Sequence, residues 1–113
     1  MTTWERKQGD LEDTLLVGLC GIADITGATV LGLARLGSGA VVQLAGGTIF
    51  NAVATSTLPC AVIVPLGSTG GWLETATPGE WMYETELTWP TGTKLTWPGR
   101  GYDTIVVSED LGP

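Results

Sequence analysis

The sequence contains no histidine, few charged residues and only two cysteines. Histidine is the commonest general base near neutral pH and the commonest metal ligand, so the usual centre of acid–base catalysis is missing. Zinc sites built from cysteine and histidine are excluded as well. Charged residues make up 15% of the 113 residues, against roughly 25% in an average soluble domain. These absences leave architecture and assembly, rather than catalysis, as the main subjects that the sequence can address.

Positive charge is especially scarce, with 5 Lys+Arg against 12 Asp+Glu and a net charge of −7. Binding to nucleic acid requires clustered basic residues that neutralise phosphates, and the basic residues here are scattered. We therefore expect no nucleic-acid partner and, for the same reason, no anionic membrane surface. The longest apolar runs span about nine residues, such as Leu58–Leu66, whereas a membrane-spanning helix needs about 20.

The first seven residues, MTTWERK, lack the apolar segment of a secretory signal, so we expect synthesis in a cytoplasm. In a reducing compartment Cys20 and Cys60 are predicted to be reduced thiols in the core. A disulfide between them is the less favoured alternative.

Turn-forming residues recur along the chain between stretches of alternating polarity, a pattern typical of all-β proteins. The length suits one domain. The pattern predicts an antiparallel β-sandwich of about seven or eight short strands, with an eight-stranded barrel as the alternative. Residues 1–8 are expected to form an N-terminal arm and residues 108–113 a C-terminal tail. The predicted strands are Thr14–Cys20, Ala28–Leu36, Ala40–Ala45, Thr48–Ala54, Pro59–Leu66, Glu80–Trp89, Thr93–Trp97 and Tyr102–Val107, with Gly46-Gly47 as a turn.

The best-defined strand, Glu80–Trp89, alternates between a dry face and a wet face. Thr91-Gly92 is predicted to turn it into a hairpin. Glu84 and Glu86 share the wet face, where a glycosidase would also place two carboxylates. Their regular alternation indicates solvated side chains instead. The inward positions are Trp81, Tyr83, Thr85, Leu87 and Trp89, and Trp97 of the returning strand is also predicted to face inward.

Other possible sites lack essential parts. The segment Gly67–Gly71 lacks the lysine of a phosphate-binding loop, and neither lysine stands in a recognisable Ser–Lys arrangement. The acidic pairs Glu12-Asp13 and Glu109-Asp110 lack the further ligands of a calcium loop. We therefore predict that the protein is not an enzyme, and we assign no catalytic, cofactor-binding or metal-binding residue.

From Leu36 to Leu73 the chain contains no charged residue, a run of 38 positions. Exposed strand faces normally carry lysine and glutamate. Two explanations remain open. Either these strands lie centrally in the sheets and their loops are merely rich in Gly, Thr and Ser, or another protein chain covers part of this surface.

Three aromatic residues are candidates for a protein interface. Trp4 and Trp72 lie outside the predicted strands, and Phe50 lies within the uncharged run. Aromatic side chains of this kind anchor protein–protein contacts. They can also stack on sugars, so a carbohydrate-binding module that uses Trp4 or Trp72 is the alternative function.

Several short segments occur together in an order that is familiar from one family. They are Gly9-Asp10, DITGATV from Asp24 to Val30, Arg35, PGEWMYE from Pro78 to Glu84, WPTG from Trp89 to Gly92, Trp97-Pro98, Tyr102, Ile105–Val107 and Glu109–Leu111. Over nearly the whole chain they resemble the immunoglobulin-like N-terminal module of tailed-bacteriophage upper-baseplate proteins and related virion proteins.

This resemblance implies an immunoglobulin-like sandwich that acts in a virion by protein–protein contact, without catalysis or a cofactor. Its expected partners are other virion proteins and further copies of itself. Upper-baseplate proteins continue beyond this module into segments that hold a receptor-binding protein, whereas this sequence ends at Pro113. A capsid-decorating, neck or tail accessory subunit is therefore expected at least as much as a baseplate one.

Overall fold

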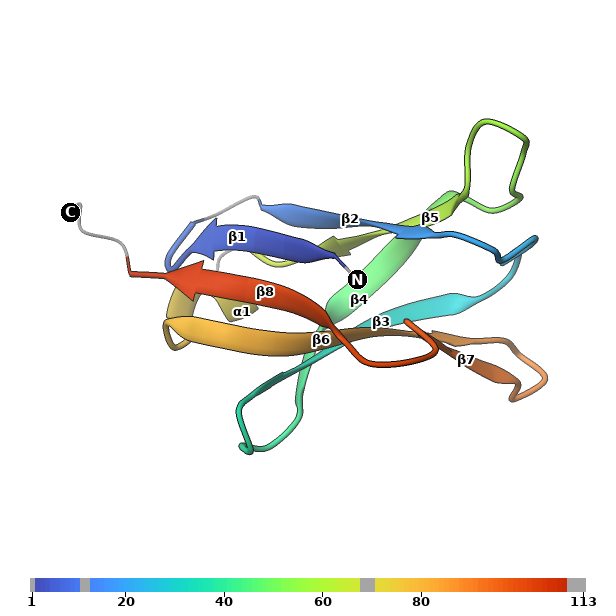
Figure 1. Cartoon of the computed structure of the whole chain (residues 1–113). Helices are drawn as coiled ribbons and strands as arrows, with labels where there is room; N and C mark the ends of the chain where they lie inside the picture. The colour runs from blue at the N-terminus through green and yellow to red at the C-terminus, as the bar shows by residue number, and fades with distance from the viewer. Residues whose placement is uncertain (1, 11–12, 68–70, 110–113) are drawn as a thin grey trace.

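The computed structural model describes residues 2–10, 13–67 and 71–109 and is nearly all β, which confirms the predicted fold class (Figure 1). The elements are β1 (Thr3–Lys7), β2 (Thr14–Leu19), β3 (Thr29–Leu36), β4 (Val42–Asn51), β5 (Cys60–Pro65), α1 (Trp72–Thr75), β6 (Gly79–Thr88), β7 (Lys94–Trp97) and β8 (Asp103–Ser108). A single helical turn, α1, lies in the loop before the β6–β7 hairpin.

The strands follow the order β1-β8-β6-β3-β4-β5-β2, with β7 beside β6. The β3–β6–β8 and β2–β5 pairings are those of an immunoglobulin-like sandwich. Strand β4 pairs first with β3 and then with β5, so it passes from one sheet to the other. Among the strands of the described ranges every pairing is antiparallel except that of β1 with β8, which is parallel.

One sheet contains β1, β8, β6, β3 and β7, and its strands include Glu, Asp, Lys and Arg side chains; we call it the charged sheet. The other contains β2, β5 and the second half of β4, from Thr48 to Asn51. No charged residue occurs in these strands, so we call it the uncharged sheet. Its strands β2 and β5 lie across the sandwich from β6 and β8 (Figure 1).

The predicted turn at Gly46-Gly47 is wrong, because both glycines lie inside the continuous strand β4. A Cβ atom at Gly47 would lie 2.7 Å from the Ile63 carbonyl oxygen and 2.8 Å from Val30 Cγ1. Glycine therefore serves close packing here, where β4 passes between the sheets, and not chain reversal.

Two further expectations are corrected at the ends of the molecule. The expected arm, residues 1–8, contains strand β1, because residues from Thr3 to Lys7 find pairing partners on β8. The C-terminal tail was expected from residue 108, one residue too early, because Ser108 still belongs to β8. Residues 110–113 lie outside the described residues.

The hairpin prediction is confirmed, with β6 as its long strand. Its buried and outward positions alternate along the whole strand. Gly92 has a φ of 91° in the turn to β7, a conformation that suits glycine. The core between the sheets includes Leu15, Val17, Leu19, Val62, Val64, Trp81, Tyr83, Leu87 and Ile105, and Trp89 and Trp97 pack against it half-buried.

Both cysteines are free. Cys60 is buried, as predicted, and its thiol contacts the Ala52 carbonyl oxygen at 3.3 Å. The core placement predicted for Cys20 is wrong: it is exposed, because it follows β2 in the outward-facing phase of that strand. Within the described ranges no helix is long and apolar enough to cross a membrane.

Candidate assembly surface

The outer face of the uncharged sheet is built from side chains that alternate with the core positions of β2 and β5. Leu16 on β2 lies opposite Ile63 on β5, and Thr48 on β4 lies on the other side of Ile63. Phe50 follows two residues later, beside a register shift in β4. Leu16 is 55% exposed and Phe50 is 57% exposed. We call Leu16, Ile63, Thr48 and Phe50 the uncharged face.

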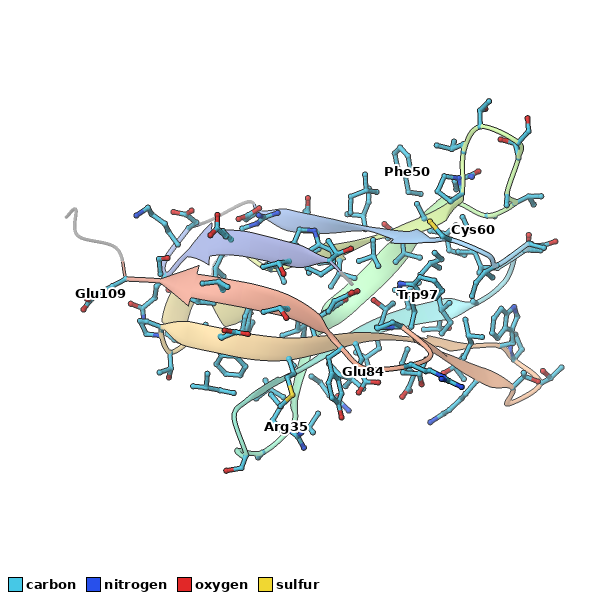
Figure 2. The ribbon with its side chains drawn as sticks, viewed as in Figure 1. Arg35, Phe50, Cys60, Glu84, Trp97 and Glu109 are labelled. Carbon is cyan, nitrogen blue, oxygen red and sulfur yellow. The ribbon has the colours of Figure 1, made fainter. Side chains whose placement is uncertain are left out.

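This face points away from the charged sheet. Phe50 projects from one side of the sandwich, whereas Arg35 projects from the opposite side (Figure 2). Large exposed apolar side chains on a face without charge are typical of surfaces that contact another protein. The arrangement therefore presents an exposed apolar surface of the kind on which another protein can pack.

Central burial explains one part of the uncharged run, and another part of the run is exposed. Strand β5 lies centrally between β4 and β2, and its inward side chains are buried. In contrast, five of the seven large hydrophobic residues that are exposed in the described ranges belong to the run, namely Val41, Val42, Phe50, Val53 and Leu58. Central burial explains β5, but it leaves β4 and the following loop unexplained.

The charged sheet presents the opposite kind of outer surface. Glu84 and Glu86 lie on the outer side of β6, as predicted, and Glu86 pairs with Lys94 of β7 at 3.5 Å. On β3, the Arg35 guanidinium lies 3.9 Å from the Met82 sulfur. A shallow hollow of about 110 Å³ lies here, lined by Leu33, Ala34, Arg35, Val41, Met82, Glu84 and Tyr102.

The remaining two predicted interface residues pack against the core. Trp4 meets Tyr83 edge to face, with ring centroids 5.7 Å apart, and Trp72 meets Trp81 in the same way at 5.1 Å. Both tryptophans are half-buried. Of the three predicted interface residues, only Phe50 belongs to the uncharged face, and the structure does not bring the three together.

A wider hollow of about 590 Å³ opens where β1 faces the start of β2, and its described lining is Glu5, Arg6, Lys7, Asp10, Asp13 and Ser108. Arg6 bridges the two strands. Its Nε lies 2.9 Å from Asp13 Oδ2, and its Nη2 donates to the Thr14 carbonyl oxygen at 3.2 Å. These contacts connect the edge strands β1 and β2 of the two sheets. The positive charge of Arg6 is thereby paired with Asp13 of the same chain.

Among the residues that the structure describes, no group of three or more Cys, Asp or Glu side chains is placed to hold a metal ion. Parts of three segments weighed as ligand sites lie outside the described residues: Glu12, Asp110 and residues 68–70 of the glycine-rich segment. The glycine-rich segment is followed by α1, which has no side-chain cap.

Sequence reasoning missed Leu16 and Ile63, although a usable pattern was present. In the segment TLLVGL, Leu15, Leu16 and Val17 are consecutive apolar residues, so a strand there exposes one of them unless something covers it. Strand β5 has the same pattern, with consecutive apolar residues from Cys60 to Val64. Comparison of the sequence with models of known protein families and with curated protein sequences finds no match.

Proposed function

We propose that this protein is a non-enzymatic structural subunit of a tailed-bacteriophage virion, which acts by assembling with other virion proteins and with copies of itself. The observation that supports assembly is the uncharged face, where Leu16 and Phe50 are both more than half exposed. The virion setting is supported by the sequence resemblance described above. The position in the particle is proposed as capsid decoration, neck, tail or baseplate accessory.

The mechanism is burial of apolar surface between subunits. Removing apolar area from water is worth roughly 25 cal/mol per Å² before the costs of association are subtracted. The net charge of −7 opposes contact between subunits through their charged sheets. Contact through the uncharged sheets brings no like charges together, so the electrostatic repulsion between subunits is lowest there.

The proposal is tested in purified particles of the phage or prophage whose genome encodes this sequence. Quantitative mass spectrometry should find the chain at a fixed copy number relative to the major capsid or tail-tube protein. Particles that lack the chain, or contain it in amounts that vary between preparations, would contradict the proposed function.

A further inference from the structure

Strand β2 has one edge without a partner. It pairs with β5 on one side and ends the strand order of the sheet, so no described strand pairs with its second edge. A free strand edge presents unpaired backbone N–H and C=O groups, which natural proteins usually protect with lysine, proline or a bulge. The segment TLLVGL has none of these, and its register with β5 is unbroken. Arg6 of β1 contacts this edge at its start, at the Thr14 carbonyl oxygen.

The register identifies which backbone groups are free. The Leu66 N–H donates to the Asp13 carbonyl at 2.8 Å, so Asp13 is a hydrogen-bonded position of the β2–β5 ladder. Bonded positions recur every second residue in an antiparallel pair. The N–H and C=O groups of Leu16 and Gly18 therefore point away from β5. The contact of Arg6 with the Thr14 carbonyl agrees with this phase.

We propose that β2 pairs with β2 of a second copy of this chain, antiparallel and around a two-fold axis at Val17. In this register Leu16 of each copy exchanges two hydrogen bonds with Gly18 of the other. The pairing would join the two uncharged sheets into one continuous sheet. The inference deepens the proposed assembly function and rests on it.

Side-chain shape favours this register. Leu16 and Gly18 lie on the outer side of β2, and residues that face each other across a strand pair share one side of the sheet. Leu16 would therefore lie over Gly18 of the second copy. A Cβ atom at Gly18 would meet only Pro59 Cγ, at 3.9 Å. The leucine of one copy thus faces open space above the glycine of the other.

Charge favours a second copy at this edge over contact elsewhere. Two identical chains of net charge −7 repel each other. The strands that meet in this pairing, and β5 behind each of them, contain no charged residue, and at the start of the edge Arg6 and Asp13 pair with each other at 2.9 Å. The glutamates of β6 lie on the other sheet and remain away from the axis. Four central hydrogen bonds make a small interface, so we expect a dissociation constant in the micromolar range.

The test is sedimentation of the purified full-length chain over a concentration series. Wild type should pass from monomer to dimer, and Gly18→Pro should raise the dissociation constant at least about tenfold, because proline removes an edge donor that the β2–β5 ladder does not use. Leu16→Lys provides a second variant that keeps the N–H. Thr29→Glu is the control, since it adds a charge at an exposed position on the other sheet and should leave the dimer intact.

Amide hydrogen exchange provides a second readout. The Leu16 and Gly18 amides should become protected as concentration rises, whereas the Val17 amide should be protected at all concentrations. A chain that stays monomeric, or a dimer that both Gly18→Pro and Leu16→Lys leave intact, would overturn the strand pairing. Either result leaves the proposed function to be judged separately, by the presence of the chain in purified particles.

Discussion

The ring of Trp72 stands edge to face on the ring of Trp81, with centroids 5.1 Å apart and an interplanar angle of 89°. Trp81 is itself buried, and its Nε1 donates to the Thr77 carbonyl at 2.9 Å. The contact attaches α1 to the core at the point where the chain enters β6. In this structure Trp72 therefore stabilises the fold, whatever else it contacts.

We predict that Trp72→Ala lowers the free energy of unfolding by about 2 kcal/mol, because it removes a half-buried indole and its aromatic contact. Phe50→Ala is the matched control, and its effect should stay within about 0.5 kcal/mol because Phe50 is exposed. Chemical unfolding followed by tryptophan fluorescence measures both. Equal losses for the two variants would contradict this assignment.

The two neighbouring glycines of β4 are predicted to respond differently to alanine. At Gly47 a Cβ atom would collide with the Ile63 carbonyl oxygen and with Val30 Cγ1, so Gly47→Ala should cost about 1–3 kcal/mol. At Gly46 the nearest atom is the Val30 carbonyl oxygen at 3.8 Å, so Gly46→Ala should change stability by no more than about 0.5 kcal/mol. Thermal unfolding of the pair checks the prediction, and the reverse order would show that β4 does not cross between the sheets as described.

Stability should fall at alkaline pH because of Tyr83. Burial raises the pKa of Tyr83 to about 12 from an ordinary value of 10.0; a hydrogen bond with Thr85 lowers it, and the Asp103 carboxylate raises it further. Between these values the folded chain keeps a proton that the unfolded chain has lost. The contribution of Tyr83 to the free energy of unfolding should therefore be constant below about pH 10 and fall by up to about 2–3 kcal/mol by about pH 12.

The Tyr83→Phe variant separates this effect from other alkaline changes. It should lose about 1 kcal/mol at neutral pH, because the Thr85 hydroxyl donates to the Tyr83 oxygen at 3.0 Å. Between about pH 10 and pH 12 its free energy of unfolding should then not show the decrease that the ionisation of Tyr83 causes in the wild type. In a Tyr102→Phe background, the phenolate absorbance reports Tyr83 alone, since the chain has two tyrosines. Titration at an ordinary tyrosine pKa would contradict the buried placement.

The local pattern predicted strands wherever one face of a strand was wet and the other dry. Strand β6 is the clearest example, because its glutamates and its aromatic residues alternate without interruption. Strand β1 lacks such a pattern and depends on pairing with β8, about a hundred residues later, so no local feature predicts it. Gly47 was misread for the same reason, since the atoms that require glycine there belong to β3 and β5.

The contact surface could be predicted only in part. The absence of charge between Leu36 and Leu73 directed attention to β4 and to Phe50, which is exposed, and its role in an interface stays a prediction. Trp4 and Trp72 were chosen because large aromatic residues outside strands often anchor interfaces. Their contacts with Tyr83 and Trp81 depend on how distant segments pack, and the local sequence pattern does not indicate that packing.

The account depends on contact between the uncharged face and neighbouring subunits. Its most direct test compares the copy number of two variants in purified particles by quantitative mass spectrometry. Phe50→Glu puts a carboxylate on the uncharged face, and Thr29→Glu adds the same charge at an exposed position on the charged sheet. We predict that Phe50→Glu reduces incorporation at least about tenfold, the equivalent of roughly 1.4 kcal/mol, while Thr29→Glu incorporates like wild type. Full incorporation of a folded Phe50→Glu chain would contradict the account.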